Sequence, residues 1–93
     1  MKESEKNLDR LLRGKVKGLG GWSLKLDTTF ISGLPDRLLL FPGGRICFAE
    51  VKTSGEKARK LQKAVHRKLK KLGFDVYIVD NKEVINQIIK EYV

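Results

Sequence analysis

Two acidic residues and a lysine in the middle of the chain have the types and the spacing to bind a divalent cation beside a phosphate. Asp36 and Glu50 lie on either side of Pro42-Gly43-Gly44, and Lys52 follows Glu50 by two positions. Hard cations such as Mg²⁺ take carboxylate oxygens as ligands, and a lysine can neutralise negative charge that develops on a phosphate. If these side chains converge, they could support metal-assisted hydrolysis of a phosphodiester.

The turn between two predicted strands decides whether the carboxylates meet. The apolar segments 34–41 and 45–52 are predicted to be strands. A two-residue hairpin loop needs φ > 0 at its first central residue, which Pro42 cannot provide. If Gly43 and Gly44 formed a two-residue loop, Pro42 would be one of the two strand residues that flank it. The pairing of those two residues needs a backbone N–H, which proline lacks. We therefore predict a three-residue loop, with Pro42 and Gly43 right-handed and Gly44 left-handed with a bulge.

This loop length sets the register of the hairpin. Phe41 then faces Arg45, and counting outward places Asp36 opposite Glu50, with Lys52 on the same face of the sheet. Two opposed like charges are unfavourable, and a divalent cation between them would compensate. Two alternatives stay open: the acids could lie in water at frayed strand ends, or Lys52 could neutralise them. A slip of one residue would also separate the pair.

The elements that must position these residues follow from hydrophobic periodicity. Helices are predicted over 4–18, 56–72 and 81–92, and strands over 22–26, 34–41, 45–52 and 74–79. Both faces of the two central strands are largely apolar, so helices should cover both sides of the sheet. The order helix, three strands, helix, strand, helix predicts one α/β domain, a sandwich around a mixed four-stranded sheet.

The helical spacing also predicts which side chains are buried. In the helix over 56–72 the expected buried stripe is Ala58, Leu61, Val65, Leu69 and Leu72, followed by Gly73 as the C′ residue. The first helix should bury Leu8, Leu11, Leu12 and Val16. In the last helix, Val84, Ile85, Ile88 and Ile89 are either core or an interface. We expect Trp22 and Cys47 in the core and His66 on the surface, because one His and one Cys cannot build a zinc site.

The charge indicates a polyanionic partner. Twenty Lys and Arg against eleven Asp and Glu give a formal charge of +9, which favours nucleic acid first and an anionic membrane surface second, although a merely soluble basic protein has the same balance. No apolar run is long enough to span a bilayer, and the charged start does not resemble a signal peptide. With one cysteine and no internal disulfide, a cytoplasmic location is expected. The basic residues concentrate between positions 52 and 71, where Glu56 stands alone as an acid.

The motif Gly33-Leu34-Pro35-Asp36, followed by a strand, a turn and Glu50-Val51-Lys52, resembles the PD-(D/E)xK nuclease signature and, more narrowly, its VRR-NUC branch. The resemblance covers nearly the whole chain, 1–93, as a single nuclease domain with a restriction-endonuclease-like sandwich. It includes a Glu on the first helix, Gly-Gly-Arg before the Glu-x-Lys strand, a Gln on the following helix and Leu-Gly before the last strand. The stretch before that Gln is more basic than is typical of the family.

The resemblance implies a role for each site residue. Asp36 and Glu50 would bind Mg²⁺ or Mn²⁺ together with the Val51 carbonyl and Glu5, Lys52 would act on the attacking water, and Gln62 would hydrogen-bond nearby. We prefer Glu5 to Glu3 because Glu5 precedes Leu8 by three positions, along the buried stripe. Glu5 could instead serve the helix dipole, and Gln62 could be an ordinary exposed residue. The expected phosphate contacts are Lys25, Lys57, Lys60, Lys63 and Arg67, with a solvated surface lysine as the alternative for Lys25.

Small stand-alone members of the family, often phage-encoded, look like homodimers that cut branched DNA. The resemblance therefore implies a structure-selective DNA endonuclease, with Holliday junctions as the leading substrate and a place in DNA repair and recombination, acting in the host cytoplasm if the chain is phage-encoded. Two alternatives remain. One is a nuclease for flaps, nicked DNA, linear DNA or RNA, and the other is a nucleic-acid binder without catalytic activity.

Overall fold

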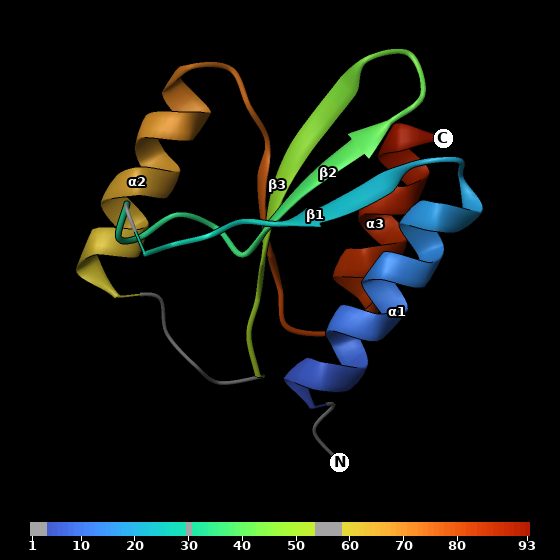
Figure 1. Cartoon of the computed structure of the whole chain (residues 1–93), viewed down its shortest axis with the longest axis horizontal. Helices are drawn as coiled ribbons and strands as arrows, with labels where there is room; N and C mark the ends of the chain where they lie inside the picture. The colour runs from blue at the N-terminus through green and yellow to red at the C-terminus, as the bar shows by residue number, and fades with distance from the viewer. Residues whose placement is uncertain (1–3, 30, 54–58) are drawn as a thin grey trace.

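One mixed sheet separates the helices of the chain into two layers (Figure 1). The computed structural model describes residues 4–29, 31–53 and 59–93. Within these residues the elements are α1 (Glu5–Gly18), β1 (Trp22–Lys25), β2 (Arg37–Phe41), β3 (Arg45–Val51), α2 (Lys60–Lys71), β4 (Val76–Val79) and α3 (Lys82–Tyr92). This order, the mixed four-stranded sheet and the helices on both faces confirm the predicted architecture.

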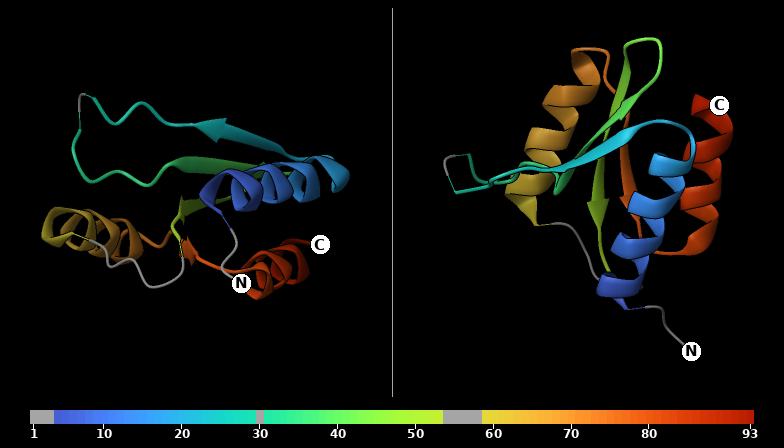
Figure 2. Two further views of the ribbon diagram at one scale, coloured as in Figure 1. Left: turned by 90° about the horizontal axis from the view of Figure 1, so that it is seen from below. Right: turned by 45° about the vertical axis from the view of Figure 1, so that its right-hand side comes forward.

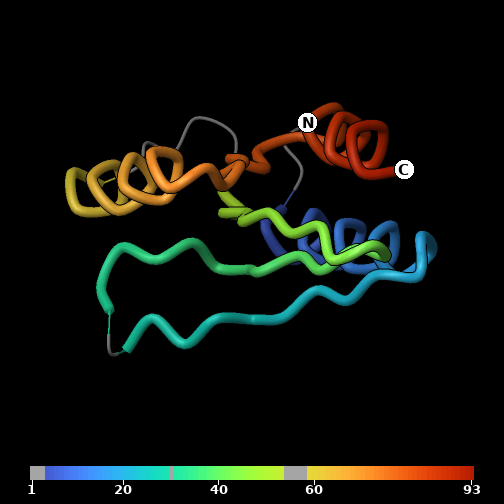
Figure 3. Tube along the Cα trace, turned by 90° about the horizontal axis from the view of Figure 1, so that it is seen from above, coloured from blue at the N-terminus to red at the C-terminus, as the bar shows by residue number. Residues whose placement is uncertain are grey.

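The sheet has the strand order β1-β2-β3-β4, with antiparallel pairs on either side of β2 and a parallel pair between β3 and β4. The crossover from β3 to β4 carries α2 on one side of the sheet, while α1 and α3 lie together on the other (Figure 2). The segments that lead out of β1 and into β2 extend beyond the sheet and run alongside α2 (Figure 3). The end of the sheet from which these two segments extend therefore lies between α1 and α2.

The hairpin between β2 and β3 has the predicted loop length and register. Phe41 pairs with Arg45 across a three-residue turn. The expectation of a right-handed Gly43 is wrong, because both Gly43 and Gly44 have positive φ, of 87° and 75°. A proline followed by a glycine with φ near about +80° is the pattern of a type II turn, which suits Pro42 as well as a type I turn does.

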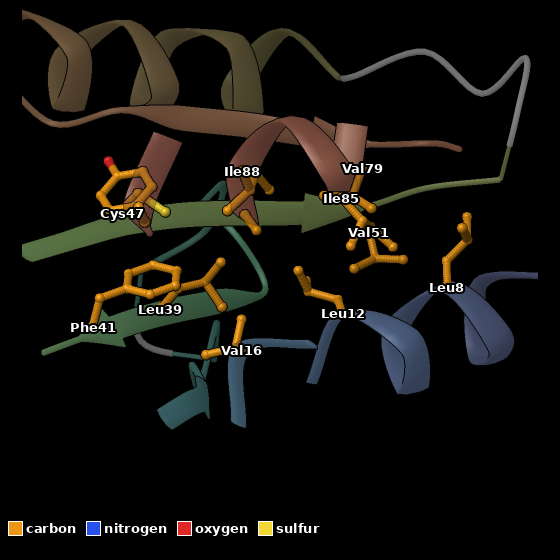
Figure 4. Packing of buried hydrophobic residues seen from close by; sticks show 12 residues of the cluster. Leu8, Leu12, Val16, Leu39, Phe41, Cys47, Val51, Val79, Ile85 and Ile88 are labelled. Atoms are coloured by element: carbon orange, nitrogen blue, oxygen red, sulfur yellow. The ribbon is translucent and has the colours of Figure 1, made fainter. Parts of the chain in front are cut away.

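The hydrophobic core lies between the sheet and the pair α1 and α3 (Figure 4). As predicted, α1 buries Leu8, Leu12 and Val16 against this side, and Cys47 is buried on β3. Ile85 and Ile88 of α3 are fully buried and Val84 and Ile89 pack against them, so the interface considered for α3 is core. The pKa of the Cys47 thiol is raised to about 12, mainly by burial, so this cysteine is an unreactive core residue.

The prediction for the face of α2 is wrong at Leu61, Leu72 and His66, while Val65 and Leu69 are partly buried. Leu61 and Leu72 are 52% and 66% exposed, whereas His66, expected on the surface, is buried. Of the predicted helix, residues 56–58, and with them Ala58, lie outside the described part of the chain, and α2 begins at Lys60. The helix contacts the sheet mainly at β4, at the end where Glu50 lies, so the side that it turns inward carries polar residues.

Trp22, which is predicted to lie in the core, is 66% exposed. Its strand partner is Leu40, on the face of the sheet opposite the core, and α2 covers this face only toward β4. An apolar periodicity shows that a strand has two apolar faces, but it does not show how far a helix reaches across each.

The strands are shorter than predicted at the ends nearest the candidate site and the helix caps. The Phe74 N–H donates to Leu69 O and the Gly73 N–H donates to Lys70 O. These bonds cap α2, and Gly73, with φ 98°, is the C′ residue as predicted. Because Gly73 and Phe74 belong to the cap, β4 starts only at Val76. Among the described residues, none of the helices combines the length and the hydrophobicity that a membrane span requires.

Candidate active site

Asp36 and Glu50 meet where β2 begins. The last paired residues of the β2–β3 ladder are Arg37 and Ala49, and one further step places Asp36 opposite Glu50, as the register predicts. Asp36 lies just outside β2 because its carboxylate Oδ2 accepts the Val51 N–H at 2.9 Å. Its own carbonyl accepts the Leu26 N–H at 2.8 Å. Asp36 is therefore held between β1 and β3, with no frayed end at this position.

Glu50 is an acidic group in an unfavourable environment. Its side chain is buried, with 4% relative exposure for the residue. Burial raises the pKa of Glu50 first, and the neighbouring negative charge of Asp36 and a hydrogen bond with it raise it further, while Lys52 lowers it; the result is a pKa of about 7. Asp36, Glu50 and Lys52 thus interact as predicted, and the lysine does not by itself offset the repulsion.

The donor set suits a hard divalent cation. Glu50 Oε1 is buried and has no hydrogen-bond partner in the structure. The described residues hold no cluster of three or more His, Cys, Asp or Glu side chains arranged around one point. Mg²⁺, however, is usually held by one or two carboxylates and keeps several waters, so a carboxylate pair with an unsatisfied oxygen fits it.

Glu5 and Val51 lie beside Asp36 on the core side. They line one shallow hollow together with Asp36 and Lys25. Glu5 is exposed in the first turn of α1, and its Oε1 accepts the Thr53 N–H at 3.3 Å. Glu5 and Val51 therefore share a hollow with Asp36, although Glu50 is not among the residues that line it, and Glu5 is anchored to the segment that follows β3.

Asp9 and Arg37, which are absent from the site predicted by sequence, form the ion pair beneath this hollow. The Arg37 Nε–H and Nη2–H donate to the two carboxylate oxygens of Asp9, each at 2.8 Å. Arg37 is buried on the core face directly after Asp36, and Asp9 follows Glu5 by one helical turn. A bidentate pair of this kind fixes α1 against the start of β2. The clue in the sequence was an arginine on an otherwise apolar strand face, because a buried charge needs a partner.

Gln62 and His66 approach the carboxylates from α2, one helical turn apart. Gln62 lines a second hollow with Asp36, and its Oε1 accepts the Arg59 N–H at 3.1 Å. His66 Nε2 lies 3.9 Å from Glu50 Oε1, and both atoms are buried without a partner. The pKa of His66 is lowered by burial and by the charges of Lys70 and Lys52, which favours the neutral imidazole. His66 is thus beside the site, which corrects the surface prediction; its spacing from Gln62 was the available clue.

The predicted phosphate contacts are exposed where the structure describes them. Lys60, Lys63 and Arg67 are exposed on α2, Lys25 is exposed beside the core-side hollow, and Lys57 lies outside the described residues. Lys52 is different, because it is buried directly after β3 and its N–H donates to Val79 O at 3.0 Å. The site therefore combines one buried cation at the carboxylates with exposed cations around it.

Comparisons with known proteins give the class and the family of this chain, a nuclease of the VRR_NUC type. A protein of Acyrthosiphon pisum secondary endosymbiont phage 1, named "Putative nuclease p44", is 34% identical over 80 residues, which are 86% of this chain and 86% of that protein. A solved VRR_NUC domain aligns with a TM-score of 0.87 at 30% identity, covering 96% of this chain and 97% of that one. No protein-family model matches the chain. The chain belongs to the VRR-NUC family of nucleases.

The raised pKa of Glu50 predicts an unusual pH dependence of stability when metal is removed. The folded state binds this proton more tightly than an ordinary glutamate at 4.5 does, so the contribution of Glu50 to stability falls as the pH rises from 4.5 through about 7. Glu50→Gln cannot lose the proton. We expect the stability of the variant relative to the wild type to increase by about 3 kcal/mol between low pH and pH 8.

Urea unfolding in EDTA across this pH range measures the difference. The exposed Glu83→Gln, which removes an equal charge in the first turn of α3, serves as the control and should lose at most a constant amount of stability, with the same dependence on pH as the wild type between pH 5 and 8. Parallel pH profiles for the wild type and Glu50→Gln would contradict the conclusion that the pKa of Glu50 is raised in the folded protein.

Proposed function

We propose that the protein is a metal-dependent, structure-selective DNA endonuclease. The observation that carries the proposal is a buried glutamate whose Oε1 lacks a partner, placed against an aspartate and beside a buried lysine. Such a group is costly to bury and is found where a site needs it, because perturbed carboxyl groups concentrate at functional sites. Within a nuclease family, the reaction that this arrangement supports is phosphodiester hydrolysis.

Asp36 and Glu50 would hold Mg²⁺ or Mn²⁺, with the Val51 carbonyl and Glu5 as the remaining protein ligands. When bound, the ion supplies a lowered pKa for a coordinated water and stabilisation of the leaving oxygen. The Val51 N–H, which donates to Asp36 Oδ2 at 2.9 Å, keeps the Asp36 carboxylate in place. The protein thus offers the Asp36 carboxylate in a fixed position, which limits the reorganisation required on binding.

Lys52 has two roles in this proposal. Its charge lowers the pKa of Glu50, which keeps more of the carboxylate ionised for cation binding. Its ammonium group would also position the attacking water and offset the negative charge that develops on the phosphate. Gln62 would hydrogen-bond near the water after releasing the Arg59 N–H that it accepts in this structure.

The DNA strand would pass across Asp36. The core-side hollow with Glu5 and Lys25 and the α2-side hollow with Arg59 and Gln62 both include Asp36, so a backbone that follows them would place a phosphate beside Asp36. The exposed basic residues of α2 extend the second hollow, and such residues track phosphates without reading sequence. This arrangement favours recognition of DNA shape.

We infer that the substrate is branched DNA, with the Holliday junction first, and that a homodimer cuts it during DNA repair or recombination in the cytoplasm. A single small domain has one site, and a two-fold dimer supplies the two sites that paired incisions need. The surface available for a second copy is the apolar sheet face that α2 leaves open, with Trp22 and Leu24 of β1 paired to Leu40 and Leu38 of β2.

Removal of either carboxylate should abolish cleavage and preserve binding. We expect Asp36→Asn and Glu50→Gln to cut a synthetic four-way junction at least about 10³-fold more slowly in Mn²⁺, because each removes a ligand on which the chemistry depends. Both variants should bind the junction in EDTA as tightly as the wild type, or more tightly. Glu83→Gln is the matched control. Wild-type rates in Asp36→Asn would disprove the site.

The same assay, run on flap, nicked, linear and RNA substrates, tests the substrate class. Preferential cutting of the junction supports the proposal. Preferential cutting of another substrate would contradict the junction as the preferred substrate and identify that substrate instead. Binding without cleavage of any substrate in Mg²⁺ or Mn²⁺ would show a binding protein and overturn the enzyme proposal.

The basic residues of α2 should control affinity and its salt dependence. Replacing Lys60, Lys63 and Arg67 together by Ala should weaken junction binding and reduce the slope of log K against log salt by about one for each phosphate that is no longer neutralised. Replacing Lys15, Lys17 and Lys90, which are exposed on α1 and α3, changes the net charge equally and should have a much smaller effect. Equal effects of the two triple variants would show that net charge alone drives binding.

The dimer is tested by light scattering during gel filtration. We expect twice the mass of one chain for the wild type and one chain mass for Trp22→Lys, because a charge on the apolar face opposes its burial. Far-ultraviolet circular dichroism controls for folding of the variant. A monomeric wild type at micromolar concentration, or a dimeric Trp22→Lys, would contradict the assigned surface.

A further inference from the structure

His66 is the one histidine of the chain, and the proposed mechanism does not use it. It is buried in α2 with 6% relative exposure, and its Nε2 lies 3.9 Å from Oε1 of Glu50. Both atoms are shielded from solvent, and neither has a hydrogen-bond partner. A buried polar atom without a hydrogen-bond partner destabilises the folded state, so two facing atoms of this kind require an explanation.

The two atoms are chemically complementary. Glu50 Oε1 is an acceptor, and a neutral imidazole carries its proton on one of two nitrogens. With the proton on Nδ1, Nε2 would present a lone pair to a carboxylate oxygen, which is repulsive. With the proton on Nε2, the same approach is attractive. The carboxylate therefore selects the Nε2–H tautomer.

The separation of 3.9 Å is about 1 Å too long for a hydrogen bond. Hydrogen bonds at catalytic sites are often long in the free protein and shorten when the site is loaded. In the free protein Glu50 lies opposite Asp36, one step beyond the last paired residues of the β2–β3 ladder, and no cation yet draws the two carboxylates together. A cation held by the carboxylate pair would leave Oε1 of Glu50 as the acceptor that faces Nε2 of His66.

We propose that His66 is a positioning residue: its Nε2–H donates to Glu50 Oε1 and fixes the carboxylate so that Oε2 faces the cation beside Asp36. This inference rests on the proposed function, because it assigns His66 to the same metal site. It also explains the orientation of α2. The helix turns Gln62 and His66 toward the carboxylates, and Leu61 and Leu72 remain exposed as a result.

Mn²⁺ affinity, measured by isothermal titration calorimetry, separates positioning from packing. We expect His66→Phe and His66→Met to fill the space and to bind Mn²⁺ about 10–100-fold more weakly, because partners that orient a metal ligand typically contribute that much. His66→Gln, which retains an N–H donor, should recover most of the affinity. Two apolar variants are used so that failure of one to fold leaves the other.

The outcomes are distinguishable from those that test the proposed function. Absence of Mn²⁺ binding by the wild type would overturn the proposed metal site and this inference with it. Wild-type affinity in folded His66→Phe or His66→Met, or an equal loss in His66→Gln, would overturn the role of His66 and leave the metal site intact. DNA binding in EDTA should be the same in all variants.

The tautomer gives a second readout that packing alone would not determine. Because the chain has a single histidine, its ring nitrogens give one unambiguous pair of signals in a long-range ¹H–¹⁵N spectrum. In the Mg²⁺-bound protein we expect the Nε2–H tautomer. A neutral ring protonated on Nδ1, or an imidazolium, would contradict the proposed hydrogen bond.

Discussion

The structure depends on the placement of Glu50 opposite Asp36 at the end of a buried sheet. Burial and the facing charge both oppose ionisation of Glu50, and Lys52 opposes them incompletely, so the carboxyl group titrates near 7 in the absence of a cation. A fold that holds like charges together in this way forgoes stability at that point. The compensation comes from a ligand of opposite charge, and this is the physical basis for assigning a cation to the site.

Each surrounding element contributes to holding that pair in place. The three-residue turn fixes the register, and the Val51 N–H holds Asp36 where the ladder ends. On the core side, the ion pair of Asp9 with Arg37 joins α1 to the start of β2 and brings Glu5 alongside. On the other side, α2 presents polar residues and leaves much of the sheet face uncovered. This placement of α2 accounts for both the buried His66 and the exposed Trp22.

The parts of the fold that rest on local chemistry could be predicted from the sequence. Pro42 excludes a two-residue loop, and that exclusion was enough to pair Asp36 with Glu50, although it did not decide the conformation of Gly43. The buried stripe of α1 and the core position of Cys47 followed in the same way. The rotation of α2, the exposure of Trp22 and the ion pair of Asp9 with Arg37 depend on which surfaces meet in space. Periodicity cannot supply that information, because a basic helix has several faces that could pack.

The most direct test of a cation at these carboxylates is the number of protons released when Mn²⁺ binds, measured by calorimetry at pH 7 in buffers of different ionisation enthalpy. Because the pKa of Glu50 in the free protein is about 7, binding at this pH should release about half a proton from the carboxylate pair. The release should disappear in Glu50→Gln and decrease as the pH rises. Mn²⁺ binding to the wild type without proton release, or with the same release in Glu50→Gln, would show that the cation does not bind at these carboxylates.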